Sequence, residues 1–276
     1  MSNHLKISIV TPSFNQGQFV ESTVRSVLEQ NYPELEYIFM DGGSTDSTID
    51  VIDKYRDKFF HFRSHRDEGQ AAAVAEGFET SGGDILAYLN SDDMLAPRAL
   101  FYVDAFFRNN PDIDVLYSHR LAIDTNGIAI YYWILPTHSS YLMSRWDYIP
   151  QETTFWRRSI WERAGNIDKS FRFAMDYDLF VRFMKLGKFK RVNRFLGAYR
   201  WHDDAKSSRL FETVGREEIA RVWREHGIKK SKISSFLERR FHQAIDSNSN
   251  TFVENHHIRS GCLPGLGYHI NDVWGW

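Results

Sequence analysis

The stretch DILAYLNSDD, residues 84–93, decides the fold of this chain. Its first half is a short apolar run that is typical of a buried strand, and it ends in the adjacent carboxylates Asp92 and Asp93. A solvated turn is the ordinary explanation of such an ending. A site at which carboxylates bind a divalent cation is the alternative, and the neighbouring segments discriminate between the two.

Three earlier segments also predict strands with polar endings. Residues 7–10 form a β-branched apolar run, and because Pro12 lacks a backbone N–H we expect this strand to end at Thr11 and Pro12. Residues 36–40 and 59–63 are the next two strands, and helical spacing of apolar residues lies between the predicted strands. Strands that alternate with helices predict an α/β fold, Rossmann-like, with a mostly parallel central sheet flanked by helices.

The pattern changes after residue 97. A helix is expected at 97–109, a strand at 115–121 and a hairpin turn at 124–127, where the sequence is DTNG. From about residue 212 the chain has the pattern of a helical C-terminal extension. We therefore expect a catalytic domain at 1–207, with halves at 1–96 and 97–207, and an extension at 208–276.

Composition excludes several classes of protein. The chain has 276 residues, of which 42% are hydrophobic, and a formal net charge of -2, so a nucleic-acid-binding function is disfavoured. Cys262 is the only cysteine, which rules out an intrachain disulfide and a thiolate metal site. No window has the roughly 18 to 20 apolar residues of a spanning helix, and the N-terminal apolar run is short for a signal peptide. We expect a cytoplasmic protein.

The ends of parallel strands gather at one edge of a sheet, where ligands bind in open α/β folds. This edge would collect Asp41, Asp67, Asp92 and Asp93. Carboxylates that lie together repel one another unless a cation or hydrogen-bond donors compensate, and oxygen ligands of this kind suit Mg²⁺ or Mn²⁺. Each motif alone is explained by a turn or a helix cap, and the glycine-rich stretches match neither a Walker A loop nor a dinucleotide fingerprint. The order and spacing of all four motifs favour a functional site.

Taken in that order, these motifs closely resemble those of family 2 glycosyltransferases of GT-A fold. The resemblance begins with the segment from IVTPSFNQGQ to DGGSTDST and goes on through the segment from DEGQAAAVAEG to LNSDD. The resemblance continues through QETTFWRR, AMDYDLFVRF and YRWHDDAKS, and covers roughly residues 6–207. It implies inverting transfer of a sugar from a nucleoside diphosphate sugar, with a UDP-linked donor as the first expectation. The implied acceptor is a saccharide or a lipid-linked saccharide in polysaccharide assembly at the cell envelope.

The resemblance also implies roles for individual residues. Asp176 would be the general base, and Asp93 would ligate Mn²⁺ or Mg²⁺ with His202 as a further ligand. The metal motif departs from the usual DxD form because Ser91 occupies its first position. Nucleotide contacts are implied for Thr11, Pro12, Phe14, Asn15, Asp41, Asp67, Gln70 and Asp92, and acceptor-side positions for Glu152, Trp156 and Trp201.

Several of these roles have alternatives. Asp176 and Asp178 would diverge by about 200° on a helix, so only one can face the substrate, and Asp178 is expected to cap the helix or to pair with Arg182. His202 could equally be a hydrogen-bonding histidine, Glu152 could be structural, and buried aromatics are commoner than tryptophans that stack on sugars.

Two other functions compete with glycosyl transfer. A nucleotidyltransferase that makes nucleotide sugars shares the sheet and the metal chemistry, but residues 11–18 (TPSFNQGQ) lack the basic residues of a triphosphate loop. A nucleotide- or saccharide-binding module without activity is the other alternative.

The C-terminal extension carries a basic amphipathic segment at 228–241. Such a segment can pack on its own domain, join a homodimer, or make peripheral contact with the inner face of a membrane.

Overall fold

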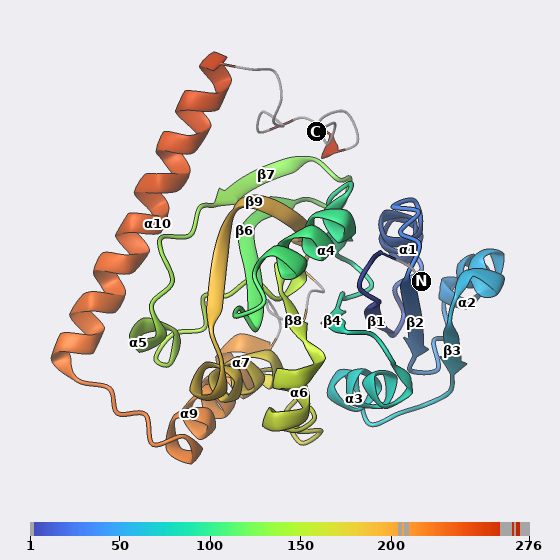
Figure 1. Ribbon diagram of the computed structural model, residues 1–276, viewed down its shortest axis with the longest axis horizontal. Helices are drawn as coiled ribbons and strands as arrows, with labels where there is room; N and C mark the ends of the chain where they lie inside the picture. Colours follow the sequence, from blue (N-terminus) through green and yellow to red (C-terminus); the bar gives the residue numbers. More distant parts are fainter. Residues whose placement is uncertain (1–2, 204–205, 207–209, 260–266, 268, 271–276) are drawn as a thin grey trace.

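The computed structural model describes residues 3–203, 206, 210–259, 267, 269 and 270, with only the backbone at 252–259 (Figure 1). The strands are β1 (Ile7–Ser13), β2 (Leu35–Asp41), β3 (His61–Ser64), β4 (Ile85–Tyr88), β5 (Met94–Leu95), β6 (Val115–Ile123), β7 (Ala129–Trp133), β8 (Phe155–Arg157) and β9 (Phe189–Arg200). The α-helices are α1 (Val20–Leu28), α2 (Thr48–Ile52), α3 (Gln70–Thr80), α4 (Ala99–Asn109), α5 (Ser140–Met143), α6 (Arg158–Ala164), α7 (Met175–Leu186), α9 (Arg216–Glu225) and α10 (Lys232–Arg259). Short 3-10 helices lie at η1 (Asp53–Lys58) and η2 (Gln151–Thr153), and a π-helical turn lies at η3 (Phe211–Gly215).

One curled sheet runs through the molecule in the order β3-β2-β1-β4-β8-β6-β9-β5. Strand β7 lies off this order and pairs with residues 120–123 of β6. The pairings among β1, β2, β3 and β4 are parallel, as the alternation of strands and helices predicted. Strand β8 joins this half to the second half through antiparallel pairs with β4 and β6. The α/β fold is confirmed, and the second half mixes parallel and antiparallel pairs, including the predicted hairpin at 124–127.

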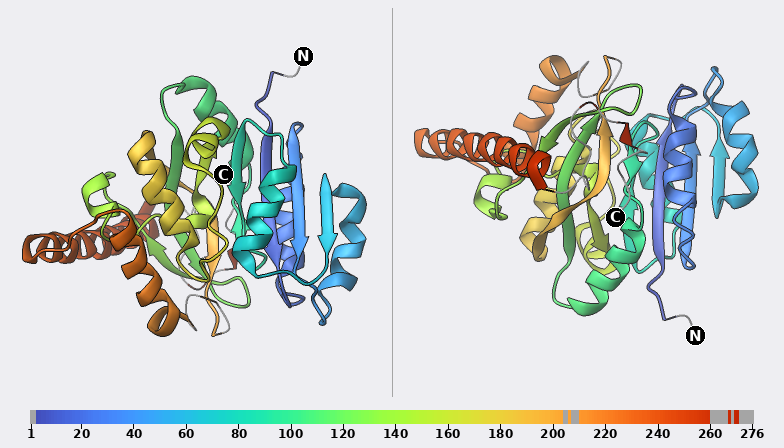
Figure 2. Two further views of the ribbon diagram at one scale, coloured as in Figure 1. Left: turned by 90° about the horizontal axis from the view of Figure 1, so that it is seen from below. Right: turned by 90° about the horizontal axis from the view of Figure 1, so that it is seen from above.

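Both faces of the sheet are covered by helices, as the views from below and from above show (Figure 2). Side chains along a strand point alternately to opposite faces, so Ile9 packs under α1 and α4 while its neighbour Val10 packs under α3. The glycine at position 77 of α3 makes this packing close, because a Cβ there would lie 2.6 Å from Val10. Two apolar cores result, one on each face.

The prediction that β1 ends at Pro12 was wrong. The strand continues to Ser13, and Pro12 lies opposite Met40 of β2. The pairing of β1 with β4 stops at Val10 and Tyr88. Because N–H directions alternate along a strand, the missing N–H of Pro12 faces the side on which β1 has no partner strand. Proline therefore costs this strand no ladder hydrogen bond.

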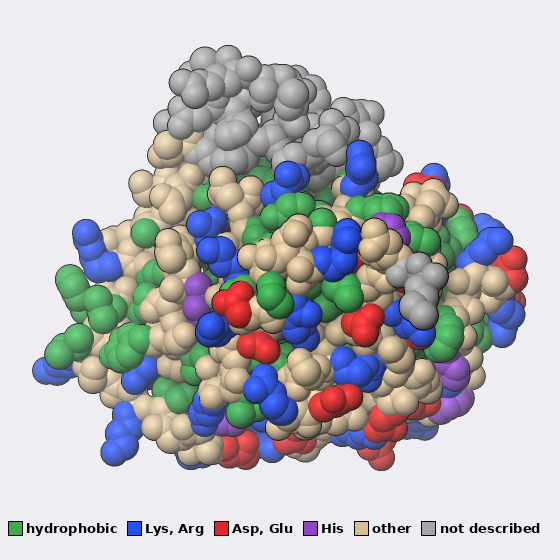
Figure 3. All heavy atoms as spheres, viewed as in Figure 1, with side chains coloured by type: hydrophobic (Ala, Val, Ile, Leu, Met, Phe, Trp, Pro, Cys, Tyr) green, Lys and Arg blue, Asp and Glu red, His purple; other side chains and the backbone are tan. Residues whose placement is uncertain are grey.

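The C-terminal helices pack on the domain that precedes them. Val222 of α9 and Phe241 and Ile245 of α10 belong to the core beneath α6 and α7. The first turns of α10 extend beyond this contact and expose Ile233, Phe236 and Leu237. Figure 3 shows hydrophobic side chains together with Lys and Arg at the margin of the molecule over this end of α10. No helix in the part of the chain described here is long and apolar enough to cross a bilayer.

Candidate active site

A cleft of about 740 Å³ opens at the carboxyl ends of β1 and β4 and is closed on its other side by the second half of the domain. Eight of the residues predicted for the site line it, namely Pro12, Phe14, Asp67, Gln70, Asp92, Asp93, Glu152 and Asp176. Arg120, Asp147, Arg172, Tyr199 and Lys206 also line it, and none of them was predicted. The fold therefore brings eight of the fourteen predicted site residues to one cavity.

Asp93 lies at the bottom of this cleft and is 1% exposed. The backbone N–H of Arg200 donates to its Oδ1 at 3.0 Å, and the side-chain amide of Asn90 donates to its Oδ2 at 3.3 Å. Burial, with the nearby charges of Asp92 and Glu152, raises the pKa of the Asp93 carboxyl well above its usual range. A carboxylate in this position is stabilised by any cation that enters the cleft.

Asp92 projects beside Asp93 and meets His202. The His202 Nε2 lies 3.0 Å from Asp92 Oδ2, and the imidazole is buried against the ring of Phe19, with the ring centroids 4.9 Å apart. In this arrangement His202 holds Asp92 in place. Direct ligation of a metal through the same nitrogen would require His202 Nε2 to leave Asp92.

Asp41 is fully buried behind the cleft wall, where it organises the loop after β2. Its carboxylate accepts hydrogen bonds from the backbone N–H groups of Gly43 and Ser44 at 2.9 and 3.0 Å and from the Ser64 hydroxyl at 2.7 Å. Asn15 supports the same loop, because its side-chain oxygen accepts from the N–H of Thr45 at 2.8 Å. Thr11 is also buried, with its hydroxyl 3.2 Å from that of Tyr37. None of these three residues lines the cavity, because Thr11 and Asp41 are buried and Asn15 is exposed at the surface.

Asp67 lines the cleft at the end of β3 and pairs with a buried arginine. Arg63 donates to Asp67 Oδ2 at 2.9 Å and to the carbonyl of Asp41 at 2.8 Å, so it joins two of the predicted aspartates. The N–H of Gly69 donates to the other oxygen of Asp67 at 2.8 Å. Gly69 has φ 108, a conformation that favours glycine, and α3 begins at the next residue.

A chain of polar side chains crosses the floor of the cleft. The Lys206 ammonium donates to the side-chain oxygen of Gln70, and the Gln70 amide donates to Asn90 at 2.6 Å. Asn90 in turn donates to Asp93 and to Gln151. Burial lowers the pKa of Lys206 to about 8. Gln70 therefore links the metal-motif segment to the far wall of the cleft.

Arg120 of β6 and Glu152 of η2 form a bidentate ion pair in the wall beside Asp93, with both N–O distances 2.8 Å. The Arg120 guanidinium also lies over the rings of Tyr199 and Trp133, at 4.8 and 5.2 Å from their centroids. Glu152 is thus a partner of Arg120, as the structural alternative for this residue expected, while it also lines the cavity.

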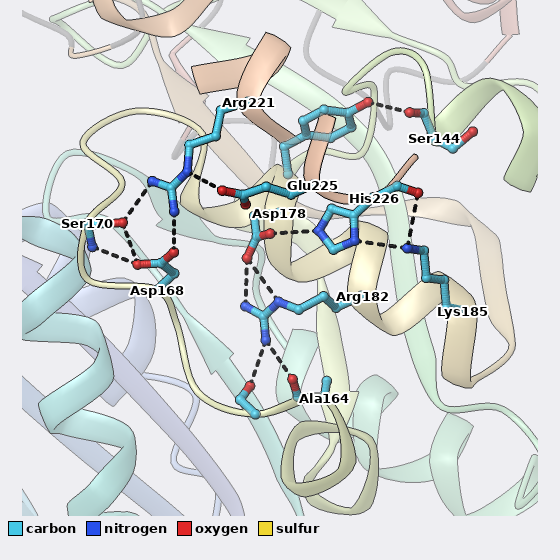
Figure 4. Close-up of polar contacts among 12 residues, drawn as sticks. Ser144, Ala164, Asp168, Ser170, Asp178, Arg182, Lys185, Arg221, Glu225 and His226 are labelled. Atoms are coloured by element: carbon cyan, nitrogen blue, oxygen red, sulfur yellow. Dashed lines mark hydrogen bonds and ion pairs between the residues drawn. The ribbon is translucent and has the colours of Figure 1, made fainter. Parts of the chain in front are cut away.

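Asp176 enters the cleft from the first turn of α7. Its Oδ1 accepts a hydrogen bond from the N–H of Tyr177 at 2.9 Å, and burial raises the pKa of its carboxyl. Asp147 lies in the same cavity, and burial together with the charge of Asp176 raises the pKa of Asp147 well above its usual range. Asp178 pairs with Arg182 and His226 (Figure 4). It does not line the cleft that Asp176 lines, so the predicted divergence of the two aspartates is confirmed.

The two tryptophans predicted for the acceptor side lie elsewhere. Trp156 is fully buried in β8, where its ring packs against Phe78 and Phe183. Trp201 is exposed to solvent and follows the end of β9. The aromatic groups that the structure does bring to the cleft wall are Phe14, Tyr88, Trp133, Phe171, Phe173 and Tyr199.

The fit of the cleft to the predicted divalent cation depends on the number of available ligands. Within the described ranges no three His, Cys, Asp or Glu side chains form a group able to hold a metal ion. Mg²⁺, however, usually binds through one or two carboxylates and substrate phosphates and keeps several waters. Asp93, which is buried in the cleft beside Asp92 and Glu152, fits such a partial site.

A sequence profile described as Glycosyl transferase family 2 matches residues 8–190. This chain belongs to glycosyl transferase family 2. The matched residues include most of β1, all of β2 to β8 and the first two residues of β9. They supply most of the cleft lining, and Tyr199, Lys206 and Leu210 lie beyond them.

Proteins with similar sequences differ in length and in the activity that their names state. An uncharacterized glycosyltransferase of Nostoc sp. is 28% identical over 98% of this chain and 87% of its own length. The chondroitin synthase of Escherichia coli is 26% identical over 83% of this chain, but this match covers 34% of the synthase. The chain thus spans about a third of that larger enzyme.

Solved structures support the same fold. Staphylococcus aureus TarS 1-349 in complex with UDP-GlcNAc superimposes with a TM-score of 0.67 at 17% identity, over 92% of this chain and 76% of TarS 1-349. The mannosyltransferase PcManGT from Pyrobaculum calidifontis, in complex with GDP-Man and Mn²⁺, gives a TM-score of 0.59 at 13% identity, over 83% of this chain and 66% of that chain. This chain therefore has the GT-A fold.

Proposed function

We propose that this protein transfers a sugar, with inversion, from a nucleoside diphosphate sugar to a saccharide or lipid-linked acceptor. The observation that carries this proposal is the convergence of Asp93 from the first half and Asp176 from the second on one cleft. Asp93 would hold a divalent cation, and Asp176 would accept the proton of the acceptor hydroxyl. Pro12, Phe14, Asp67, Gln70 and Asp92 line the cavity where the nucleotide would bind.

The chemistry needs few groups. The acceptor oxygen attacks the anomeric carbon while its proton passes to Asp176, and the bond from that carbon to the diphosphate oxygen breaks. The nucleoside diphosphate leaves with a negative charge, which Mn²⁺ or Mg²⁺ held by Asp93 would stabilise as a Lewis acid. With a single base and one displacement, the configuration at the anomeric carbon inverts.

The donor and the acceptor are proposed from the similar proteins. The TarS structure holds UDP-GlcNAc, which supports a UDP-linked donor. The chondroitin synthase and a putative teichuronic acid biosynthesis glycosyltransferase of Bacillus subtilis, 40% identical over 32% of this chain and 36% of its own length, support a role in polysaccharide assembly. With a lipid-linked acceptor, the basic and apolar start of α10 would make peripheral contact with an anionic membrane.

A thermal-shift series with nucleoside diphosphates and sugar nucleotides tests the donor, with and without Mn²⁺, because a ligand that binds the folded state raises the melting temperature. UDP-sugars with Mn²⁺ should give the largest shift. Asp93→Ala should lose the metal-dependent part, and Asp112→Ala, at an exposed surface aspartate, should keep it. A Mn²⁺-dependent shift of unchanged size in Asp93→Ala would remove Asp93 as a ligand.

Asp176→Asn separates binding from transfer. This variant should bind UDP like the unmodified protein and lose transfer by about 10²- to 10⁴-fold, the usual contribution of a general base. UDP release from the donor that the thermal-shift series selects measures transfer, and calorimetric titration with UDP measures binding. Undiminished transfer would exclude Asp176 as the base.

A further inference from the structure

The first turn of α7, which carries Asp176, has no cap of its own. Its N-cap position is Ala174, whose side chain cannot accept a hydrogen bond. The N–H groups at the start of a helix lack partners within the helix, so they need an acceptor from outside.

Glu218 of α9, 44 residues beyond Ala174, accepts from the N–H of this N-cap residue and from those of the two residues before it. One carboxylate oxygen of Glu218 accepts from the N–H of Arg172 at 2.8 Å, and the other accepts from those of Phe173 and Ala174 at 2.8 and 2.9 Å. A negative charge is also favourable at a helix N-terminus because of the helix dipole.

The same helix holds the residues just before this turn. Arg221 lies one turn beyond Glu218, on the same face of α9. Its guanidinium donates to Asp168 at 2.7 Å and to the Ser170 hydroxyl at 2.8 Å, and lies 4.1 Å from the centroid of the Phe171 ring (Figure 4). Helix α9 therefore fixes the whole segment 168–174.

This segment is a wall of the cleft. Phe171, Arg172 and Phe173 line the cavity together with Asp176, two residues beyond Ala174. The N–H of Tyr177 orients one oxygen of Asp176, so the direction of the Asp176 carboxylate depends on the backbone at the start of α7. A shift of that backbone would move the carboxylate relative to the acceptor.

We propose that Glu218 is a positioning residue for the transfer reaction. By holding the N–H groups of residues 172–174, it fixes the start of α7 and the direction in which Asp176 faces the cleft. The role rests on the proposed function of Asp176 as general base. Helix α9 lies beyond residues 8–190, which the family profile matches, so this chain completes its acceptor wall with its C-terminal extension.

The test compares Glu218→Gln with Glu217→Gln. The substituted amide at position 218 would offer one acceptor oxygen and an NH₂ group that repels N–H donors, whereas Glu217 is exposed on the same turn of α9. Glu218→Gln should lower kcat about 10- to 100-fold, since a misplacement near 1 Å has a cost of this size. KM for the donor and the affinity for UDP should stay within about twofold, because binding does not depend on the base. Glu217→Gln should match the unmodified protein.

A double-mutant cycle decides whether Glu218 acts through Asp176. In the Asp176→Asn background, Glu218→Gln should change residual UDP release from UDP-GlcNAc by less than about twofold, because coupled residues are not additive. Additive losses, or a Glu218→Gln variant with full kcat, would overturn the inference. Should Asp176→Asn itself keep full transfer, the proposed base would fail instead.

Hydrogen exchange gives a readout that needs no activity. The amides of residues 172–174 should exchange faster in Glu218→Gln than in Glu217→Gln, because their acceptor is weakened. The kcat values are calculated for the fraction of protein that binds UDP in calorimetric titration, so partial misfolding is not counted as loss of catalysis. Unchanged exchange at these amides would also overturn the inference.

Discussion

Arg120 and Glu152 show what a single buried pair does for this cleft. Their bidentate contact neutralises Glu152, which is 1% exposed at its side chain and shares the cleft with the carboxyl groups of Asp92 and Asp93. Removal of one partner would leave a carboxylate buried without its cation. The ion pair with Glu152 therefore gives Arg120 both its structural and its electrostatic role.

Arg120→Ala should lower the free energy of unfolding by about 3 kcal/mol, as expected when one partner of a buried ion pair is removed. Arg25→Ala breaks an exposed pair on α1 and should cost less than about 1 kcal/mol. Urea unfolding of both variants measures the difference. Equal losses would show that the Arg120–Glu152 pair contributes no more than a surface pair.

The ionisation of Asp176 predicts a pH dependence. Burial raises the pKa of Asp176, and a base accepts a proton only while it is ionised. Activity should therefore fall as the pH drops through a value above about 4, where a solvated aspartate titrates. A profile of kcat/KM against pH measures this acid limb, and a limb at or below pH 4 would contradict the assignment.

At the scale of elements, the sequence predicted what local patterns encode. Strands β1 to β4, the hairpin at 124–127 and the divergence of Asp176 and Asp178 all follow from spacing along the chain. Asp147 and Glu218 could not be found in this way. Asp147 does not follow a strand, and Glu218 binds the backbone of residues 172–174, which lie 44 to 46 residues before it, so only the folded chain brings either to its place. The end of β1 was predicted wrongly because the side that Pro12 faces depends on which strands pair with β1.

The close contact of α3 with β1 gives a prediction for an element. Alanine usually stabilises a helix by about 1 kcal/mol relative to glycine, but a Cβ at position 77 would lie 2.6 Å from Val10. Gly77→Ala should therefore destabilise the protein, by about 1 to 3 kcal/mol as overpacked cores do. Glu79→Ala, on the exposed side of α3, should stay within about 0.5 kcal/mol in the same thermal unfolding experiment. A more stable Gly77→Ala variant would contradict close packing here.

At the scale of the whole molecule, one continuous sheet joins the two halves through β8, and the start of α10 extends from this body. Phe236 is 55% exposed there, between Lys232 and Arg239. Phe60, before β3, is similarly exposed at 57% but lies at the other side of the molecule. The two positions form a matched pair for a test of membrane contact.

The full chain should co-sediment with phosphatidylglycerol vesicles at low salt, and less so as salt screens the charges. Phe236→Ser with Leu237→Ser should reduce sedimentation, and Phe60→Ser should not. Equal sedimentation of all three would exclude this surface as a membrane contact. A doubled mass by light scattering that the paired substitution abolishes would instead support a homodimer.

The dependence of α7 on α9 has a consequence for how the protein is made. During synthesis the nucleotide side of the cleft, up to β4, leaves the ribosome first, and the acceptor wall follows. That wall lacks its Glu218 acceptor and its Arg221 contacts until more than three quarters of the chain has emerged. A nascent chain or an early-terminated product would be able to take up a nucleotide before it could use it. Synthesis of α9 would thus be the step at which this wall of the cleft gains its support.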